Sequence, residues 1–345
     1  MIDNELLLLA VLSVSIFSML VLLLSYLTVR KSVDIRKRKS IESYKEKYNP
    51  LIFSMLSEGL LSRELTPETP LQFKAIEELL SRYAKVLEGK EEKERLFQLA
   101  SMYLTDRYQK QLMSKKWSTR MNTLYHIEDF QMIQLAEEVR RLAGRRRISH
   151  EELLHALRIL ALAQHPDLFA LLTGEFVQLS ELDLRNILVH VNAKQFDQLL
   201  LHFHKSHTPL KKAILDVISI RKEVSYLTFV ENIFASYQGE VRLRAIKALA
   251  EIGYVEDAAP YLQFLYSQKW EERMMAAKLM GSLREAPAIP RLIELLHDQS
   301  WWVRSQAGQA IAQFANGKEI LQAVLDESSD PFAKDMAWEW LYKGV

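Results

Sequence analysis

Three segments between residues 241 and 314 repeat one pattern and decide the fold: VRLRAIKALAEI (241–252), WEERMMAAKLMGSL (270–283) and WWVRSQAGQAIAQF (301–314). Their arginines, Arg242, Arg273 and Arg304, stand 31 residues apart. Small or apolar residues follow each arginine at offsets of 3, 7 and 10, namely Ala245, Leu249 and Ile252, then Ala276, Met280 and Leu283, then Ala307, Ile311 and Phe314. Because these offsets fall on one face of an α-helix, each segment predicts an amphipathic helix.

A second apolar run follows each of these helices, at residues 261–265, 292–296 and 320–325. Two short helices per unit of 31 residues are typical of an α-solenoid, in which each unit buries its apolar face against its neighbours. We therefore predict an all-α fold.

The pattern also extends toward the N-terminus. Residues 117–120 (WSTR) match 270–273 (WEER), and residues 209–220 carry the same apolar spacing with Ala213, Val217 and Ile220. Between them, Ser149 is placed to cap a helix that runs to about Gln164, and the runs 182–191 and 196–203 form a further helix pair. We divide this part of the chain into an N-terminal helical region (51–115), degenerate repeats (116–208) and clear repeats (209–345).

The composition limits the classes of function. The chain has 345 residues and a net charge of +1, so it has no bulk attraction for nucleic acid. It contains no cysteine, which excludes disulfides, thiolate metal sites and cysteine nucleophiles. Nucleotide-binding glycine loops, serine-hydrolase elbows and zinc-protease motifs are absent from the sequence. We predict no enzyme activity, no cofactor, no metal and no nucleic-acid partner.

Residues 6–29 are almost entirely apolar and predict a transmembrane helix. A helix of this length is about 36 Å long, enough to cross a hydrocarbon layer of about 30 Å. A cleaved signal peptide fits less well, because Asp3 and Glu5 precede the apolar run and the basic residues follow it.

The basic residues that follow the apolar run lie within a juxtamembrane segment (30–50). They predict a single-pass protein of the cell (inner) membrane, with residues 1–5 outside and the repeats in the cytoplasm. Residues 36–39 (RKRK) are also placed to touch anionic headgroups. Asn49-Pro50 is expected to break the helix that follows the membrane span.

The helix pairs and their opening V/W-x-R-x-x-A motif resemble HEAT repeats of the short, PBS-lyase-like type. The match is best over residues 209–341 and is recognisable again at 117–130. The resemblance implies a protein-binding scaffold. The layout of one apolar helix followed by repeats is similar to bacterial membrane-anchored HEAT proteins, some of which occur beside membrane glycosyltransferases.

Four arginines, Arg120, Arg242, Arg273 and Arg304, occupy equivalent repeat positions. One interpretation is that they line a binding groove. The resemblance favours the other, in which they pair with an acidic or carbonyl group of a neighbouring repeat, and Asp298 is placed to do so.

A second basic cluster consists of Arg140, Arg141, Arg145, Arg146 and Arg147 around Gly144. Guanidinium groups bind phosphate oxygens well, so this cluster is a candidate anion site. The competing interpretation is a solvated helix end whose cations complement the helix dipole.

Histidines at 190, 202, 204 and 207 suggest a metal site only weakly, because they lack acidic partners at ligand spacing. The single His-Glu pair, His150-Glu151, starts a helix after Ser149 and does not indicate a di-iron hydroxylase, a HEAT-type enzyme with several such pairs.

Aromatic residues are dense near the C-terminus, where Trp301, Trp302, Trp338 and Trp340 are candidate partner-binding residues. The last repeat ends without a full second helix, so its apolar face is expected to be partly uncovered. The alternative is that these rings close the core.

We therefore expect a membrane-anchored scaffold that holds a partner protein at the cytoplasmic face, with the bilayer contacted through residues 6–29. The alternatives are a non-catalytic or regulatory subunit of a membrane enzyme such as a glycosyltransferase, and a bilin lyase-like enzyme, which the anchor helix disfavours.

Overall fold

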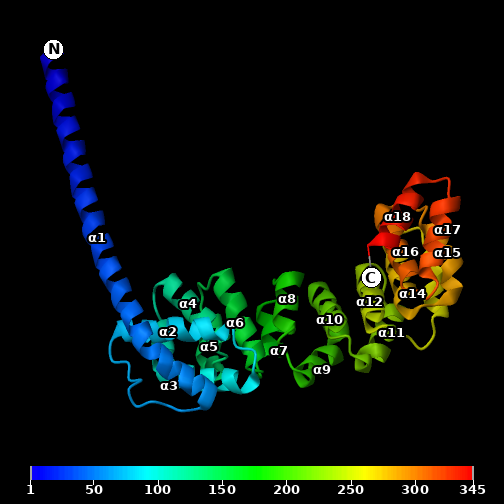
Figure 1. Cartoon of the computed structure of the whole chain (residues 1–345), viewed down its shortest axis with the longest axis horizontal. Helices are drawn as coiled ribbons and strands as arrows, with labels where there is room; N and C mark the ends of the chain where they lie inside the picture. Colours follow the sequence, from blue (N-terminus) through cyan, green and yellow to red (C-terminus); the bar gives the residue numbers. More distant parts are fainter. Residues whose placement is uncertain (1, 344–345) are drawn as a thin grey trace. The chain divides into compact units, whose positions relative to one another are not determined.

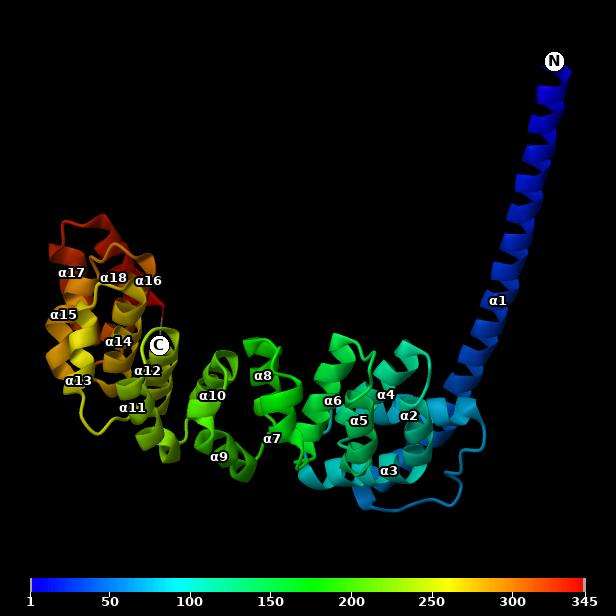
Figure 2. The ribbon, with the colours of Figure 1, turned by 180° about the vertical axis from the view of Figure 1, so that it is seen from behind.

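The computed structural model describes residues 2–343, with side chains from Leu7 onward, and all regular secondary structure in this range is helical. The first residue of the segment 1–5 and the last two of the repeat region 209–345 lie outside the described residues. The chain divides into two compact units, residues 1–163 and 164–345, which are described separately below (Figures 1 and 2).

Unit 1 contains six α-helices within its described residues and a single turn η1. They are α1 (Ile2–Glu58), α2 (Pro70–Ala84), α3 (Lys90–Leu112), α4 (Trp117–Asp129), η1 (Ile133–Leu135), α5 (Ala136–Ala143) and α6 (His150–Leu162).

Helix α1 has two parts with different surroundings. Every side chain from Leu7 to Lys39 is exposed, and the helix projects from the unit over this length (Figure 1). From Ser40 onward one face packs against α2 and α3. The helix ends at Glu58, where Gly59 has φ of +75° and donates its N–H to the carbonyl of Met55, as glycine does at many helix ends.

The expected break at Asn49-Pro50 is wrong, because Pro50 lies inside α1. Proline in a helix interior costs about 3 kcal/mol through its missing N–H and the clash of its ring. The flanking side chains of Tyr48, Ile52 and Leu56 are almost fully buried, and each contributes roughly 1.5–3 kcal/mol. Tertiary packing therefore outweighs the proline, and α1 continues.

Helices α4 and α6 lie side by side (Figures 1 and 2). As the pattern predicts, Leu124 and Ile127 of α4 are fully buried. The expected cap of α6 is also present, since Ser149 and Glu152 exchange hydrogen bonds between side chain and backbone. This cap fixes the loop that enters α6.

Unit 2 contains the clear repeats. Its elements are α7 (Leu168–Ala170), η2 (Leu171–Glu175), α8 (Glu181–Leu188), α9 (Ala193–Leu201), η3 (Phe203–Lys205), α10 (Thr208–Arg221), η4 (Val224–Tyr226), α11 (Leu227–Ser236), α12 (Glu240–Ile252), α13 (Ala259–Leu262), η5 (Gln263–Tyr266), α14 (Trp270–Leu283), η6 (Ala286–Ala288), α15 (Ile289–Leu295), α16 (Trp301–Ala312), α17 (Gly317–Glu327) and α18 (Pro331–Tyr342).

The first helices of successive repeats form a continuous row, because α8, α10, α12, α14, α16 and α18 each pack against the next. The second helices α11, α15 and α17 pack against the first helix that follows them. This arrangement is the predicted α-solenoid. In the degenerate part, α8 packs on α10 and α9 contacts α7, so the expected pairing of residues 182–191 with 196–203 is not the main contact of either helix.

The apolar template is buried at two of its three positions. Residues at offsets 3 and 7 from Arg242, Arg273 and Arg304 are fully buried. At offset 10, Phe314 is buried, Ile252 and Leu283 are half-buried, and the corresponding Ile220 of α10 is 53% exposed. The third position falls in the last turn of α10, α12 and α14 and just beyond the end of α16.

Candidate functional site

The repeat arginines hold the loops that precede their helices. Each donates to backbone carbonyls five or six residues earlier: Arg120 to Ser114 and Lys115 (2.8 and 3.1 Å), Arg242 to Tyr237 (2.7 Å), Arg273 to Ser267 and Gln268 (2.8 and 3.1 Å), and Arg304 to Asp298 and Gln299 (2.7 and 3.3 Å). This geometry supports the structural interpretation of the arginines.

Two of the arginines also bind a carboxylate of the next repeat. Arg273 forms a two-point contact with Asp298 at 2.7 and 2.8 Å. Burial alone would raise the pKa of Asp298, but hydrogen bonds from Arg273 and the Ser300 N–H outweigh it and lower the pKa. Arg120 contacts Glu152 in the same way, at 2.6 and 3.1 Å.

Sequence reasoning missed Glu152 as the partner of Arg120. The available signal was the Ser149-x-x-Glu152 capping motif, which places this carboxylate in the first turn of α6. Arg120 and Glu152 are 32 residues apart, close to the repeat length of 31, so stacking of α4 and α6 brings them together.

The second basic cluster is divided by the structure. Arg145, Arg146 and Arg147 lie in the loop before α6 and, with Lys115 and Arg120, line a pocket of about 710 Å³. Arg140 and Arg141 belong instead to α5, and Arg141 pairs with Glu138 at 3.0 Å. Lys115 was not among the predicted residues, because it comes from a loop one repeat earlier.

Three of the candidate histidines of unit 2 have separate local partners. The ring of His202 contacts the carbonyl of Gln198 at 2.9 Å, and that of His204 contacts the hydroxyl of Tyr237 at 2.9 Å. His207 caps α10. Among the described residues, no group of three metal-ligating side chains comes together.

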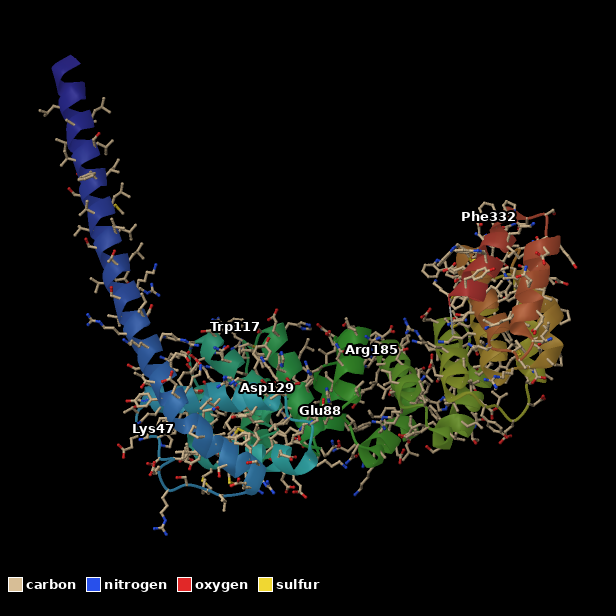
Figure 3. The ribbon with its side chains drawn as sticks, viewed as in Figure 1. Lys47, Glu88, Trp117, Asp129, Arg185 and Phe332 are labelled. Carbon is tan, nitrogen blue, oxygen red and sulfur yellow. The ribbon has the colours of Figure 1, made fainter. Side chains whose placement is uncertain are left out.

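The C-terminal aromatic surface consists of Trp301, Trp302, Phe332, Trp338 and Tyr342 on α16 and α18, all between 46% and 63% exposed. Trp301 packs edge-on against Trp302, and Trp338 contacts Tyr342. Figure 3 shows Phe332 at the edge of unit 2. Arg304, the arginine of the preceding repeat, lies over its ring at 5.0 Å.

Trp340 behaves differently from the other candidate tryptophans. Its ring packs against Gly308, where an added Cβ would lie 2.5 Å from the ring. Trp340 therefore joins α18 to α16, whereas Trp301, Trp302 and Trp338 remain accessible. Sequence reasoning missed Phe332 and Tyr342, although both belong to the aromatic-rich helix.

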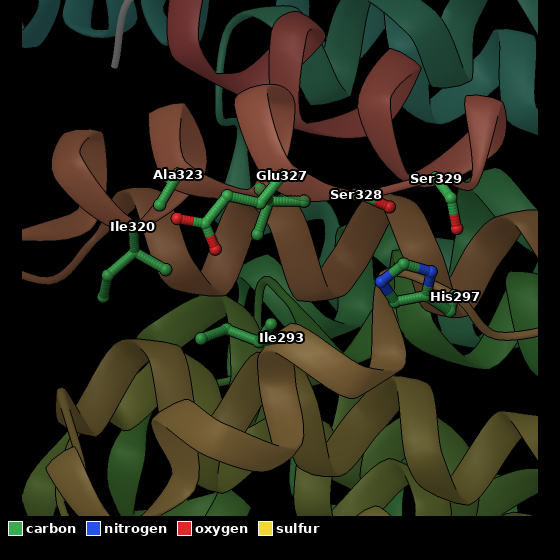
Figure 4. Close-up of a pocket in the computed structure, with 8 residues that line it drawn as sticks. Ile293, His297, Ile320, Ala323, Glu327, Ser328 and Ser329 are labelled. Atoms are coloured by element: carbon green, nitrogen blue, oxygen red, sulfur yellow. The ribbon is translucent and has the colours of Figure 1, made fainter.

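A shallow groove lies between α15 and α17, the second helices of the last repeats (Figure 4). It has a volume of about 490 Å³ and is lined by Ile293, Ile320, Ala323 and Val324, together with the polar side chains of Glu327 and His297. His297 contacts Asp330 at 3.2 Å. The groove offers apolar contact area between α15 and α17.

A row of first helices packed side by side, with second helices joining them, defines the class of protein as an α-solenoid. Comparison with known families then names the type of repeat. The family described as HEAT repeats matches residues 260–341, and the family described as PBS lyase HEAT-like repeat matches residues 241–268. Residues 241–341 are therefore HEAT repeats.

The solved structures that match this chain are distant in sequence. Kap121p bound to Pho4p is 13% identical with a TM-score of 0.46, over 87% of this chain and 39% of that chain. A designed armadillo repeat protein in complex with the peptide (KR)4 is 17% identical with a TM-score of 0.27, over 68% of this chain and 98% of that chain. No curated protein matches the sequence.

Proposed function

We propose that the protein is a membrane-anchored scaffold whose HEAT repeats hold a partner protein at the cytoplasmic face of the membrane. HEAT and armadillo-like solenoids are typical protein-interaction folds and typically non-catalytic. One observation carries the proposal: the chain joins an apolar, fully exposed helical segment to stacked repeats that leave aromatic side chains accessible.

The anchor is supported by the first half of α1. Among the described residues, α1 is the one helix that is long and apolar enough to cross a membrane, and its most apolar stretch is not buried. Apolar residues 7–29 exposed on every side of a helix are unfavourable in water and favourable in a bilayer.

The partner-binding surface is supported by the aromatic side chains of α16 and α18. Tryptophan, tyrosine and phenylalanine are enriched at protein interfaces, because they bury a large area at little cost in side-chain entropy. The anchor adds to this binding by confining the scaffold near a membrane-associated partner, which raises the effective concentration of the two.

Site-specific photo-crosslinking in intact cells tests the proposal. A photoreactive amino acid replaces Trp338 or Phe332, and in a control it replaces Leu201, an apolar side chain of α9 that is 81% exposed. We expect a discrete protein adduct at 332 and 338 and none at 201. Equal adducts at all three positions, or none at 332 and 338, would contradict a specific partner surface there.

The same experiment separates the scaffold from its alternative. A partner identified by mass spectrometry as the catalytic subunit of a membrane enzyme would assign this chain as a regulatory subunit. Extraction of the full-length protein from membranes by alkaline carbonate would contradict the anchor, independently of the adducts.

A further inference from the structure

A basic surface occupies one end of the paired helices α4 and α6 in unit 1. It is formed by Lys115, in the loop before α4, and by Arg145, Arg146 and Arg147, in the loop before α6. The two loops are joined, because the indole N–H of Trp117 donates to the hydroxyl of Ser149 at 3.0 Å. The four cations therefore come from consecutive repeats but share one surface.

The charge of this surface is not compensated. Arg120, which lines the same pocket, is neutralised by Glu152 at 2.6 Å. Among the described residues, no ion pair involves Lys115, Arg145, Arg146 or Arg147, and all four side chains are exposed. Three adjacent guanidinium groups and an ammonium group suit the oxygens of phosphate.

Helix α1 brings the surface close to the membrane. Because α1 passes through Pro50 without a break, the apolar segment and the packed segment form one helix. Ser40, the first side chain of α1 that the unit partly covers, follows Val29 by eleven residues, or about 16 Å along the helix. The headgroup layer of a bilayer leaflet extends roughly 5–8 Å beyond the hydrocarbon, so the headgroups cover part of this distance. The packed part of unit 1 therefore begins near the outer edge of the headgroups.

The surface also lies on the appropriate side of unit 1. Figure 3 shows Trp117 on the side from which the exposed part of α1 projects, with Asp129, at the other end of α4, below it. The loop with Arg145–Arg147 is on the same side as Trp117, since Ser149 contacts the indole. A span through residues 7–29 therefore turns the basic surface toward the headgroups.

We infer that this basic surface docks on the phosphate groups of anionic lipids in the leaflet next to the end of the anchor. The inference rests on the proposed membrane anchor. Each cation held near an anionic membrane surface raises the affinity of the protein for that surface by about fivefold. Trp117, which is 48% exposed, is a side chain favoured at the lipid–water interface. Docking fixes the tilt of unit 1, because α1 connects it rigidly to the span.

Fluorescence quenching in reconstituted vesicles tests the inference. The chain has no cysteine, so S118C and D129C each carry one fluorescent label, at opposite ends of α4. The full-length protein is reconstituted into phosphatidylcholine vesicles with or without phosphatidylglycerol, containing a lipid with a quencher on its headgroup. We expect quenching at position 118 to rise with phosphatidylglycerol and fall with added salt, and position 129 to stay unquenched.

Charge variants identify the residues responsible. R146Q/R147Q in the S118C background should lower the docked fraction at least several-fold. The matched control K85Q/K90Q removes the same charge from exposed lysines that flank Glu88, which Figure 3 places below Trp117, and should leave the signal unchanged.

Quenching at position 118 that does not depend on phosphatidylglycerol, or that is unchanged in R146Q/R147Q, would overturn the inference. So would a response of the label to inorganic phosphate in neutral vesicles without a response to the anionic lipid, which would assign the surface to a soluble anion. A protein that resists carbonate extraction but gives no quenching contradicts this inference alone. A protein that carbonate extracts contradicts the anchor.

Discussion

Arg120 and Glu152 show how single residues hold neighbouring repeats together. Their side chains are 8% and 1% exposed, and Arg120 also donates to two carbonyls of the loop before α4. Both charges are therefore paired and hydrogen-bonded, which is what burial of an ion pair requires. The contact joins α4 to α6 and leaves the arginine unavailable for a ligand.

Removing one partner of this pair should destabilise unit 1. Glu152→Ala leaves a buried guanidinium without a counter-charge and should cost about 3–5 kcal/mol, whereas the double variant R120M/E152L leaves no unpaired charge and should cost less than Glu152→Ala. Urea unfolding of the full-length protein in mild detergent, followed by circular dichroism, measures both. Glu91→Ala, which removes an exposed pair with Arg95, should cost less than about 1 kcal/mol. An equally small loss for Glu152→Ala would refute the structural role of the pair.

A second polar cluster in unit 1 joins Glu77, Tyr108 and His126. The hydroxyl of Tyr108 donates to Glu77 at 2.9 Å, and Lys74 pairs with the same carboxylate. Burial lowers the pKa of His126 below its ordinary value of 6.5. Burial alone would raise the pKa of Glu77, but the charges of His126 and Lys74 and hydrogen bonds from Lys74 and Tyr108 outweigh it and lower the pKa.

These shifts predict that unit 1 loses stability in acid. Both pKa values are lower in the folded protein, so the unfolded chain takes up protons first as the pH falls. The contribution of His126 to the free energy of unfolding is complete above about pH 6.5, its ordinary pKa, and declines below it. The contribution of Glu77 is lost at lower pH, below its ordinary pKa of 4.5. His126→Phe should therefore reduce the fall in unfolding free energy between pH 7.5 and 5.5, measured by urea titration at each pH. The exposed His202→Gln is the control, and an unchanged pH profile in His126→Phe would contradict the assignment.

At the scale of elements, the repeats depend on close approach of successive first helices. Gly281 of α14 lies against Ala310 of α16, where an added Cβ would be 2.6 Å from the Ala310 Cα. The contacted atom belongs to the backbone and cannot rotate away. Helices packed this closely present a continuous surface, which is the feature that the proposed scaffold uses.

Gly281→Ala tests this packing, because two effects oppose each other. Helix propensity alone favours alanine by about 1 kcal/mol, but overpacking between helices costs about 1–3 kcal/mol. We expect net destabilisation, with faster hydrogen exchange confined to α14 and α16, because repeats of a solenoid contact only their neighbours. Gly174→Ala, where nothing lies within 4 Å of the added Cβ, is the control. Unchanged exchange in Gly281→Ala would show that the helices adjust freely.

At the scale of the whole molecule, the proposed function depends on orientation in the membrane. The basic residues that follow the apolar segment favour the cytoplasmic side. With this orientation both units lie on the cytoplasmic side of the membrane, and the basic surface of unit 1 is next to the inner leaflet. A cytoplasmic partner then binds the repeats, and anionic lipid contacts the loops before α4 and α6.

Single cysteines test the orientation directly, since the natural chain has none. In intact cells, a membrane-impermeant maleimide should label D3C. Q238C, in an exposed loop before α12, should react only after the cells are opened. The reverse pattern would place the repeats outside and contradict the cytoplasmic scaffold, and labelling of both in intact cells would contradict a single span.

The sequence alone determined the repeat, because helical periodicity and a recurring arginine are local properties of the chain. It also determined the cap at Ser149 and the apolar segment, since both depend only on neighbouring residues. Its errors were at places where distant packing decides the outcome. Pro50 stays helical because Tyr48, Ile52 and Leu56 are buried, a contribution that no local pattern contains.

Only the tertiary structure decided how the charged residues are used. Stacking of α4 and α6 brings residues one repeat apart into contact, so Arg120 meets Glu152 and Lys115 joins Arg145–Arg147. The five arginines between residues 140 and 147 are divided between helix α5 and the loop before α6. Periodicity tells which face of a helix is apolar, but the identity of the covering neighbour depends on contacts about thirty residues away.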